Sequence, residues 1–89
     1  MQADYDELLE QSNRTLCAFL DTELDLGSML ANIAKVELQK GNLERCAEAK
    51  RKVRAALETV ERFKARLPRE MKQPIERRAA ELKKLISTL

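Results

Sequence analysis

The pattern of apolar and polar positions along the chain predicts helices over most of its length. Apolar residues recur at alternating steps of three and four, which is the period of an amphipathic helix and not of a strand. Two interruptions divide the pattern, one at Gly41–Asn42 and one from Leu67-Pro68 to Gln73-Pro74. The expected fold is all-α, an antiparallel three-helix bundle with a long first helix.

The first helix is expected at about residues 4–40. A regular three–four row contains Tyr5, Leu9, Ser12, Leu16, Phe19, Glu23, Leu26, Leu30, Ile33 and Glu37, and a parallel row contains Leu8, Leu20, Leu24, Ala31, Ala34 and Leu38. This phase would not survive a turn of arbitrary length, which favours one continuous helix. The alternative is four helices with a break near 21–27, where Thr22 and Asp25 have capping-box-like spacing. Gly27 also carries a helix penalty of roughly 1 kcal/mol.

The second helix is expected at about residues 43–66 and the third at about 73–87. Gly41 can end the first helix in a left-handed conformation, and the Asn42 side chain can cap the second. Pro74 fits the first turn of the third helix, where its missing donor is harmless. The second helix has the stripe Leu43, Cys46, Lys50, Val53, Leu57, Val60, Lys64 and Leu67, and the third has Ile75, Ala79, Leu82, Leu85 and Ile86.

The lengths of these helices predict an uncovered segment at the start of the chain. The first helix would be about 55 Å long, but the second only about 36 Å and the third about 22 Å. The first turns, with Tyr5, Leu8 and Leu9, would therefore extend past their neighbours. A contiguous apolar patch usually marks an interface, and twofold pairing is the commonest symmetry. The candidate protein interface is Tyr5, Leu8, Leu9, Leu16 and Phe19, with a homodimer as the simplest partner.

The region around the first turn resembles a single tetratricopeptide helix pair, over residues 30–58. Leu30, Ile33, Ala34 and Glu37 stand at the positions of its W-x-x-L-G-x-x-Y signature. Gly41-Asn42-Leu43-Glu44 resembles its turn, and Cys46 falls on a small-residue position. The match occurs once, whereas a solenoid needs roughly three repeats. The resemblance implies a helix hairpin that binds other proteins and carries no chemistry.

The charge of the chain is separated along its length. Residues 1–44 hold three basic and nine acidic residues, a net charge of −6, and residues 45–89 hold fourteen basic and six acidic, a net charge of +8. An acidic first helix packed beside two basic ones explains this internally, and Glu23 and Glu37 are expected to pair with Lys or Arg of the second helix. The alternative is a basic patch for nucleic acid phosphates, with the candidate residues Lys50, Arg51, Lys52, Arg54, Arg62 and Arg66.

The residue types give little basis for catalysis or for a metal or cofactor site. The chain has no His, the commonest general base and metal ligand. Two cysteines cannot complete a zinc site, and Cys17 and Cys46 are expected as buried, reduced thiols. The acidic N-terminus is not a targeting signal, and no apolar run approaches the roughly 20 residues of a membrane span. We expect a cytoplasmic, non-enzymatic protein-interaction or structural module without membrane contact, with a nucleic-acid-binding protein as the alternative.

Overall fold

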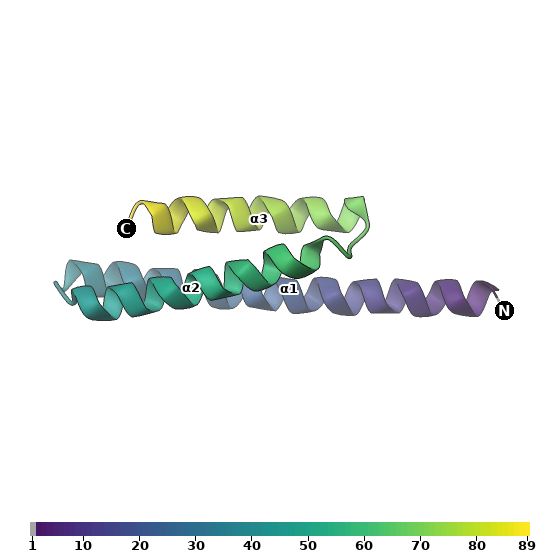
Figure 1. The fold of residues 1–89 in the computed structure, drawn as a ribbon, viewed down its shortest axis with the longest axis horizontal. Helices are drawn as coiled ribbons and strands as arrows, with labels where there is room; N and C mark the ends of the chain where they lie inside the picture. The colour runs from purple at the N-terminus through teal and green to yellow at the C-terminus, as the bar shows by residue number, and fades with distance from the viewer. Residues whose placement is uncertain (1) are drawn as a thin grey trace.

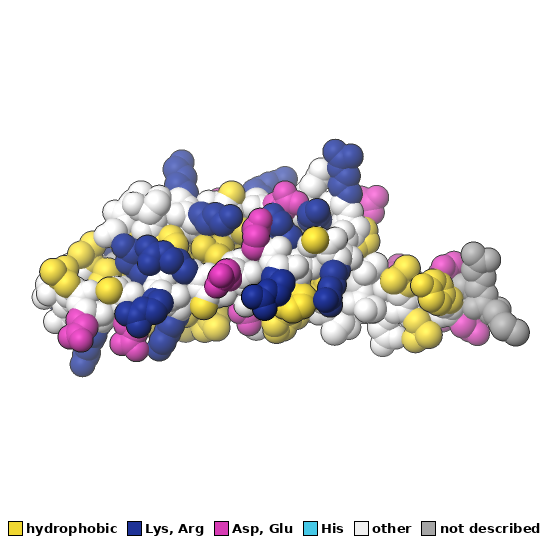
Figure 2. All heavy atoms as spheres, viewed as in Figure 1, with side chains coloured by type: hydrophobic (Ala, Val, Ile, Leu, Met, Phe, Trp, Pro, Cys, Tyr) yellow, Lys and Arg dark blue, Asp and Glu magenta, His cyan; other side chains and the backbone are white. Residues whose placement is uncertain are grey.

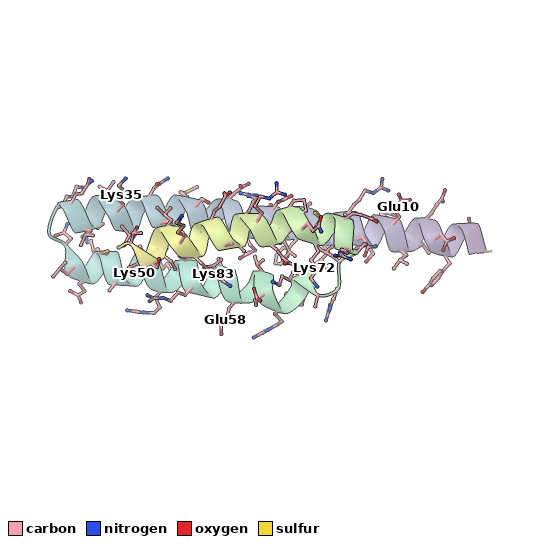
Figure 3. All side chains as sticks on the ribbon, turned by 90° about the horizontal axis from the view of Figure 1, so that it is seen from above. Glu10, Lys35, Lys50, Glu58, Lys72 and Lys83 are labelled. Atoms are coloured by element: carbon pink, nitrogen blue, oxygen red, sulfur yellow. The ribbon has the colours of Figure 1, made fainter. Side chains whose placement is uncertain are left out.

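The computed structural model describes the backbone of residues 2–89 and the side chains of residues 4–89. It contains three helices, α1 (Gln2–Gln39), α2 (Leu43–Lys64) and α3 (Arg69–Ser87). Each helix runs antiparallel to the one before it (Figure 1), and the molecule is a rod of 60 × 16 × 15 Å. Seen from above, α3 lies over the groove between α1 and α2 (Figure 3). The predicted all-α bundle with a long first helix is confirmed.

The first helix is continuous, so the four-helix alternative is wrong. The Thr22 hydroxyl does not cap a new helix but donates to the carbonyl of Ala18 at 3.0 Å, within the same helix. Gly27 is not a break either. A Cβ at this position would lie 2.6 Å from Cδ2 of Leu82, so the missing side chain is what lets α3 approach α1 closely at this point.

The turn between α1 and α2 has the geometry of a Schellman motif. Gly41 has φ = 82°, and its amide donates to the carbonyl of Leu38 at 3.0 Å. The amide of Asn42 donates to the carbonyl of Glu37 at 2.8 Å. These two bonds satisfy carbonyls that the helix end would otherwise leave free. The Asn42 side chain does not cap α2, contrary to the prediction. Its Nδ2 instead donates to Oε2 of Glu37 at 2.7 Å.

Replacing Gly41 by valine is expected to lower the free energy of unfolding by about 1–2 kcal/mol, the cost of left-handed backbone for a residue with a Cβ. No atom lies within 4 Å of a Cβ placed there, so backbone strain is the only source of this loss. Urea denaturation followed by circular dichroism measures it. Gly41→Asn is the matched control and should lose less, since Asn tolerates this conformation. Equal midpoints for the wild type and the valine variant would contradict the prediction.

The third helix begins four residues earlier than predicted. Pro68 precedes its first residue with φ = −59° and ψ = 153°, and its carbonyl accepts from the amides of Met71 and Lys72 at 3.1 and 2.9 Å. Pro74 therefore lies inside α3 and not in its first turn. Met71 is partly buried and packs against the core, which favours the additional helical turn despite the hydrogen bond that Pro74 cannot donate.

The core is built from the less regular of the two apolar rows of α1. Leu20, Leu24 and Ala31 of that row are at most 1% exposed. They pack in one cluster with residues of α2, the following turn and α3, namely Val53, Leu57, Val60, Leu67, Ile75, Ala79, Leu82 and Ile86. A smaller cluster near the α1–α2 turn holds Ala34, Cys46 and Ala49. Two predicted core positions are wrong, because Leu43 is 67% and Leu85 is 37% exposed.

Candidate protein-interaction site

The N-terminal end of α1 extends past the ends of α2 and α3 (Figure 1). Every residue from Asp4 to Glu10 is exposed, and we call residues 4–10 the overhang. Tyr5 and Leu8 are each 65% exposed and Leu9 is 49% exposed. The uncovered segment that the helix lengths predicted is therefore present, and three of its residues are large and apolar.

The other two residues of the predicted interface lie where the overhang meets the bundle. Phe19 is 45% exposed. Leu16 is partly buried and packs against the core, so only part of its side chain is accessible to a partner. Leu8, Leu9, Leu16 and Phe19 line one shallow hollow, which Arg66 borders from the end of α2. Four of the five predicted residues thus share a single surface.

The sequence analysis missed a second set of exposed apolar residues further along α1. Leu26, Met29, Ile33 and Val36 are 44, 60, 45 and 46% exposed. They continue a row that starts in the overhang and keeps alternating steps of three and four. This row, which we call the heptad face, consists of Tyr5, Leu8, Ser12, Thr15, Phe19, Thr22, Leu26, Met29, Ile33 and Val36, all of them exposed and none of them charged. A charge-free row at this spacing is the signal that could have revealed it.

The two threonine hydroxyls of the heptad face are satisfied within the helix. The hydroxyl of Thr15 donates to the carbonyl of Gln11 at 3.0 Å, and that of Thr22 donates to the carbonyl of Ala18 at the same distance. A threonine whose hydroxyl already has an acceptor keeps its methyl group available for packing, and burying it leaves no orphaned donor. Both threonine positions of the heptad face can therefore be buried against another apolar surface without leaving a hydroxyl donor unpaired.

One cation connects the acidic first helix to the basic third helix. The guanidinium of Arg78 donates to Asp25 at 2.6 Å and to Asp21 at 3.0 Å, and these hydrogen bonds, that to Asp25 foremost, raise the pKa of Arg78 above its ordinary value. The other ion pairs between the described side chains lie within α2 or join α2 to α3. Charge complementarity between α1 and α3 thus depends on this one arginine and adds to the apolar contact between the two helices.

The predicted ion pairs of Glu23 and Glu37 with the second helix are wrong. Among residues 4–89, neither carboxylate lies within 4.0 Å of a Lys or Arg nitrogen. Glu37 instead accepts the hydrogen bond from Asn42. Glu23 and Lys52 border the same hollow without making a contact, which leaves the acidic charge of α1 largely uncompensated by α2.

The basic patch lies along α2 and the turn that follows it, and basic side chains are mixed with acidic ones on the face that Figure 2 shows. Lys50 is half-buried, and Arg51, Lys52, Arg54, Arg62 and Arg66 are exposed. Lys52 lies 3.8 Å from Glu48, and the Arg66 guanidinium stacks 5.0 Å from the centre of the Phe63 ring. Nucleic-acid-binding surfaces carry basic residues clustered on one face. Here Glu48, Glu58 and Glu61 on the same helix are also exposed, which reduces the positive potential.

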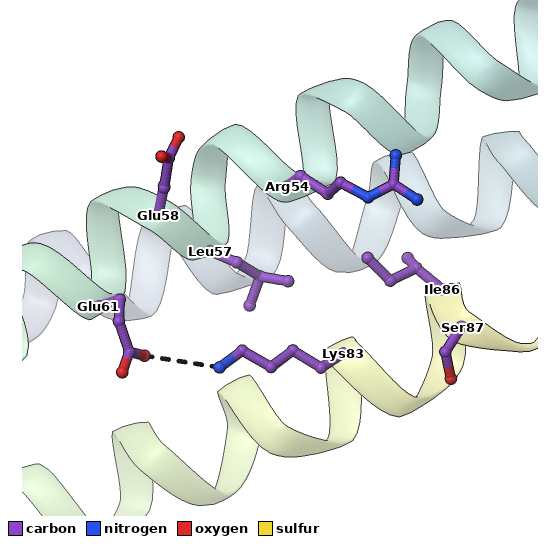
Figure 4. A pocket seen from close by; sticks show the side chains of 7 residues that line it. All are labelled: Arg54, Leu57, Glu58, Glu61, Lys83, Ile86 and Ser87. Atoms are coloured by element: carbon purple, nitrogen blue, oxygen red, sulfur yellow. Dashed lines mark ion pairs between the residues drawn. The ribbon is translucent and has the colours of Figure 1, made fainter.

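A hollow of about 420 Å³ opens between α2 and α3 (Figure 4). Leu57 and Ile86 point into it, and Nζ of Lys83 lies 3.6 Å from Oε2 of Glu61 across it. Hydrogen bonding to Lys64, with a smaller contribution from Lys83, lowers the pKa of Glu61. Arg54, Glu58 and Ser87 complete the lining. The lysine and the carboxylate that face each other across this hollow already form an ion pair, so they are not free to bind a ligand. The heptad face, by contrast, presents large apolar side chains that are exposed.

The two cysteines are free, Cys46 buried and Cys17 half-buried. Burial, and secondarily the charge of Asp21, raises the pKa of the Cys17 thiol, which keeps it protonated and poorly nucleophilic at neutral pH. Within the described part of the chain, no three His, Cys, Asp or Glu side chains are grouped to hold a metal ion. No helix of residues 2–89 is long and apolar enough to cross a membrane.

Comparison with known proteins gives no relative. No protein-family model matches the chain, and neither a curated protein sequence nor a solved structure matches it. The resemblance of residues 30–58 to a tetratricopeptide hairpin therefore stays a prediction.

Proposed function

We propose that this protein is a non-enzymatic, cytoplasmic interaction module that self-associates through the uncovered part of α1. The observation that carries the proposal is the overhang, on which Tyr5, Leu8 and Leu9 are exposed beyond the ends of α2 and α3. Burial of a large apolar side chain stabilises a complex by about 1.5–3 kcal/mol. A second copy of the chain is the simplest partner, because one twofold axis would cover both overhangs at once.

Two further features support a role in protein binding. The surface that joins the overhang to the bundle is a shallow hollow lined by Leu8, Leu9 and Phe19, which gives an incoming apolar side chain a place to pack. The tetratricopeptide-like turn, as a resemblance, also implies binding to proteins. Both features lie on α1 or at its end, so they point to the same helix as the contact element.

The test is the mass of the protein in solution, measured by light scattering for the wild type and for the double variant Leu8→Glu, Leu9→Glu. We expect a wild-type dimer and a variant that is a helical monomer, because four carboxylates would be introduced into one apolar contact. Ala47→Glu with Ala80→Glu is the matched control, since it adds the same charge at exposed positions of α2 and α3. The control should remain a dimer.

Two results would overturn the proposal. One is a wild-type monomer at all accessible concentrations, and the other is a variant that remains as dimeric as the control. Circular dichroism of each sample verifies that a change in mass does not come from unfolding. The overhang contributes nothing to the core, so the double variant should remain a folded, helical monomer whose melting temperature falls only by the stabilisation that the dimer supplied.

Nucleic-acid binding through the basic patch remains the alternative. This alternative predicts that the protein is retained on immobilised DNA or RNA and that this retention falls steeply as the salt concentration rises, since counterion release governs such binding. The exposed Arg51, Arg54, Arg62 and Arg66 are the side chains that would make the phosphate contacts. The interspersed glutamates are the reason that we favour the protein partner.

A further inference from the structure

We infer that a second copy of the chain covers the whole heptad face, its α1 lying antiparallel so that Ser12 faces Met29 of the partner subunit. This inference rests on the proposed self-association and specifies its extent and register. The face is exposed from Tyr5 to Val36, which is about 46 Å of helix. The contact would therefore extend well beyond the overhang.

The required area favours the whole face over the overhang alone. A strip about 46 Å long and one helix diameter wide, about 10–12 Å, covers on the order of 500 Å² on each copy. The two copies together reach the roughly 1,000 Å² that a specific interface needs. Pairing of only the segments from Tyr5 to Phe19 gives a strip of about 21 Å and less than half that area, which is the range of adventitious contacts.

The order of large and small residues along the face fixes the register. In one antiparallel register, the numbers of two facing heptad-face residues add up to 41. Each serine or threonine of the heptad face then lies opposite a large apolar residue of the partner subunit. Ser12 faces Met29, Thr15 faces Leu26 and Thr22 faces Phe19, while Leu8 faces Ile33 and Tyr5 faces Val36. Alternation of large and small side chains across a contact gives dense packing. A parallel pair would instead place Phe19 on Phe19 and Ser12 on Ser12.

Charge also favours the antiparallel pair. Residues 1–10 hold four acidic residues and no basic one. A parallel pair would place the two acidic ends side by side, which is unfavourable. In the antiparallel pair the acidic end lies beside the α1–α2 turn of the partner, where the exposed Lys35, Lys40 and Arg45 outnumber the acidic Glu37 and Glu44. On one side of this contact the flanking residues pair so that their numbers add up to 43, which places Asp4 beside Gln39 and Asp25 beside Ala18, and no two like charges meet there.

Cysteine cross-linking tests the register directly. In a background of Cys17→Ser and Cys46→Ala, the single variants Ser12→Cys and Met29→Cys are mixed and oxidised, then separated without reductant. We expect a covalent dimer in the mixture that is at least tenfold more abundant than in either variant alone. Ser28→Cys, at an exposed position outside the heptad face, is the control and should give no such product with Ser12→Cys.

The other outcomes each identify a different arrangement and overturn the inference. Cross-linking of Ser12→Cys with itself alone indicates a dimer centred on the overhang, and self-cross-linking of both variants indicates a parallel pair. Neither result affects the proposed self-association. A wild-type monomer in light scattering would remove both proposals together.

A second measurement is independent of the cysteine background. Met29→Glu with Ile33→Glu should raise the dissociation constant of the dimer at least 100-fold while leaving the helical content unchanged, because both side chains are exposed in the single chain. An unchanged dissociation constant, together with loss of the dimer in the Leu8→Glu, Leu9→Glu variant, would show that the contact ends at the overhang.

Discussion

Replacing Leu24 by alanine is expected to lower the free energy of unfolding by about 2–5 kcal/mol, the range for truncating a buried leucine. Leu24 is 1% exposed and belongs to the main core cluster. Because small domains have a total stability of roughly 5–15 kcal/mol, this loss is a large fraction of the whole. Urea denaturation measures it, at one fixed protein concentration so that any dimerisation contributes equally.

Leu43→Ala is the matched control for Leu24→Ala. Both variants remove the same atoms from a helical leucine, but Leu43 is 67% exposed, so its loss should remain below about 0.5 kcal/mol. Similar losses for the two variants would mean that the less regular row of α1 does not form the core. The exposed row would then be the buried one, and the proposals about the heptad face would fail with it.

Replacing Gly27 by leucine is expected to lower the free energy of unfolding by about 2 kcal/mol or more. Even the first added carbon would lie 2.6 Å from Cδ2 of Leu82, a buried side chain, and the remaining atoms require α3 to move away from α1. Overpacking a core costs about 1–3 kcal/mol, occasionally more. Leucine recovers at most about 1 kcal/mol through its higher helix propensity.

The double variant Gly27→Leu, Leu82→Ala tests the cause of that loss. If the clash with Leu82 is responsible, truncating Leu82 makes room, and the double variant should be more stable than the sum of the two single losses predicts by at least about 1 kcal/mol. Thermal and urea denaturation of all four proteins give this coupling energy. Strict additivity would show that the loss comes from the backbone at Gly27 and not from close packing.

The number, order and orientation of the helices could be predicted from the sequence because they depend on local signals. The unbroken phase of α1 and the left-handed preference of Gly41 are properties of single segments. The start of α3 could not be placed in the same way. The local pattern placed Pro74 in the first turn. The observed start after Pro68 depends on the packing of Met71 against the core, a tertiary contact that local rules do not describe.

Which face of α1 is buried was also beyond local reasoning. Both apolar rows have helical spacing, and the longer one appears the better candidate for the core. The shorter row is buried instead, since it contains Ala31 and Ala34 and adjoins Gly27, where small residues allow the neighbouring helices to approach. The overhang could be predicted because it depends on the helix lengths alone. The exposure of Leu26, Met29, Ile33 and Val36 could not be predicted, because it depends on which row of α1 forms the core.

The continuity of α1 has a consequence for how fast and at what cost the overhang can bind. An isolated peptide of seven residues would not form a helix, because nucleation is unfavourable. In this chain the overhang only propagates a helix that the bundle has already nucleated, and fraying and re-forming of such an end takes nanoseconds per residue. A partner therefore meets a preorganised surface, loses little conformational entropy on binding it, and does not have to wait for a folding step.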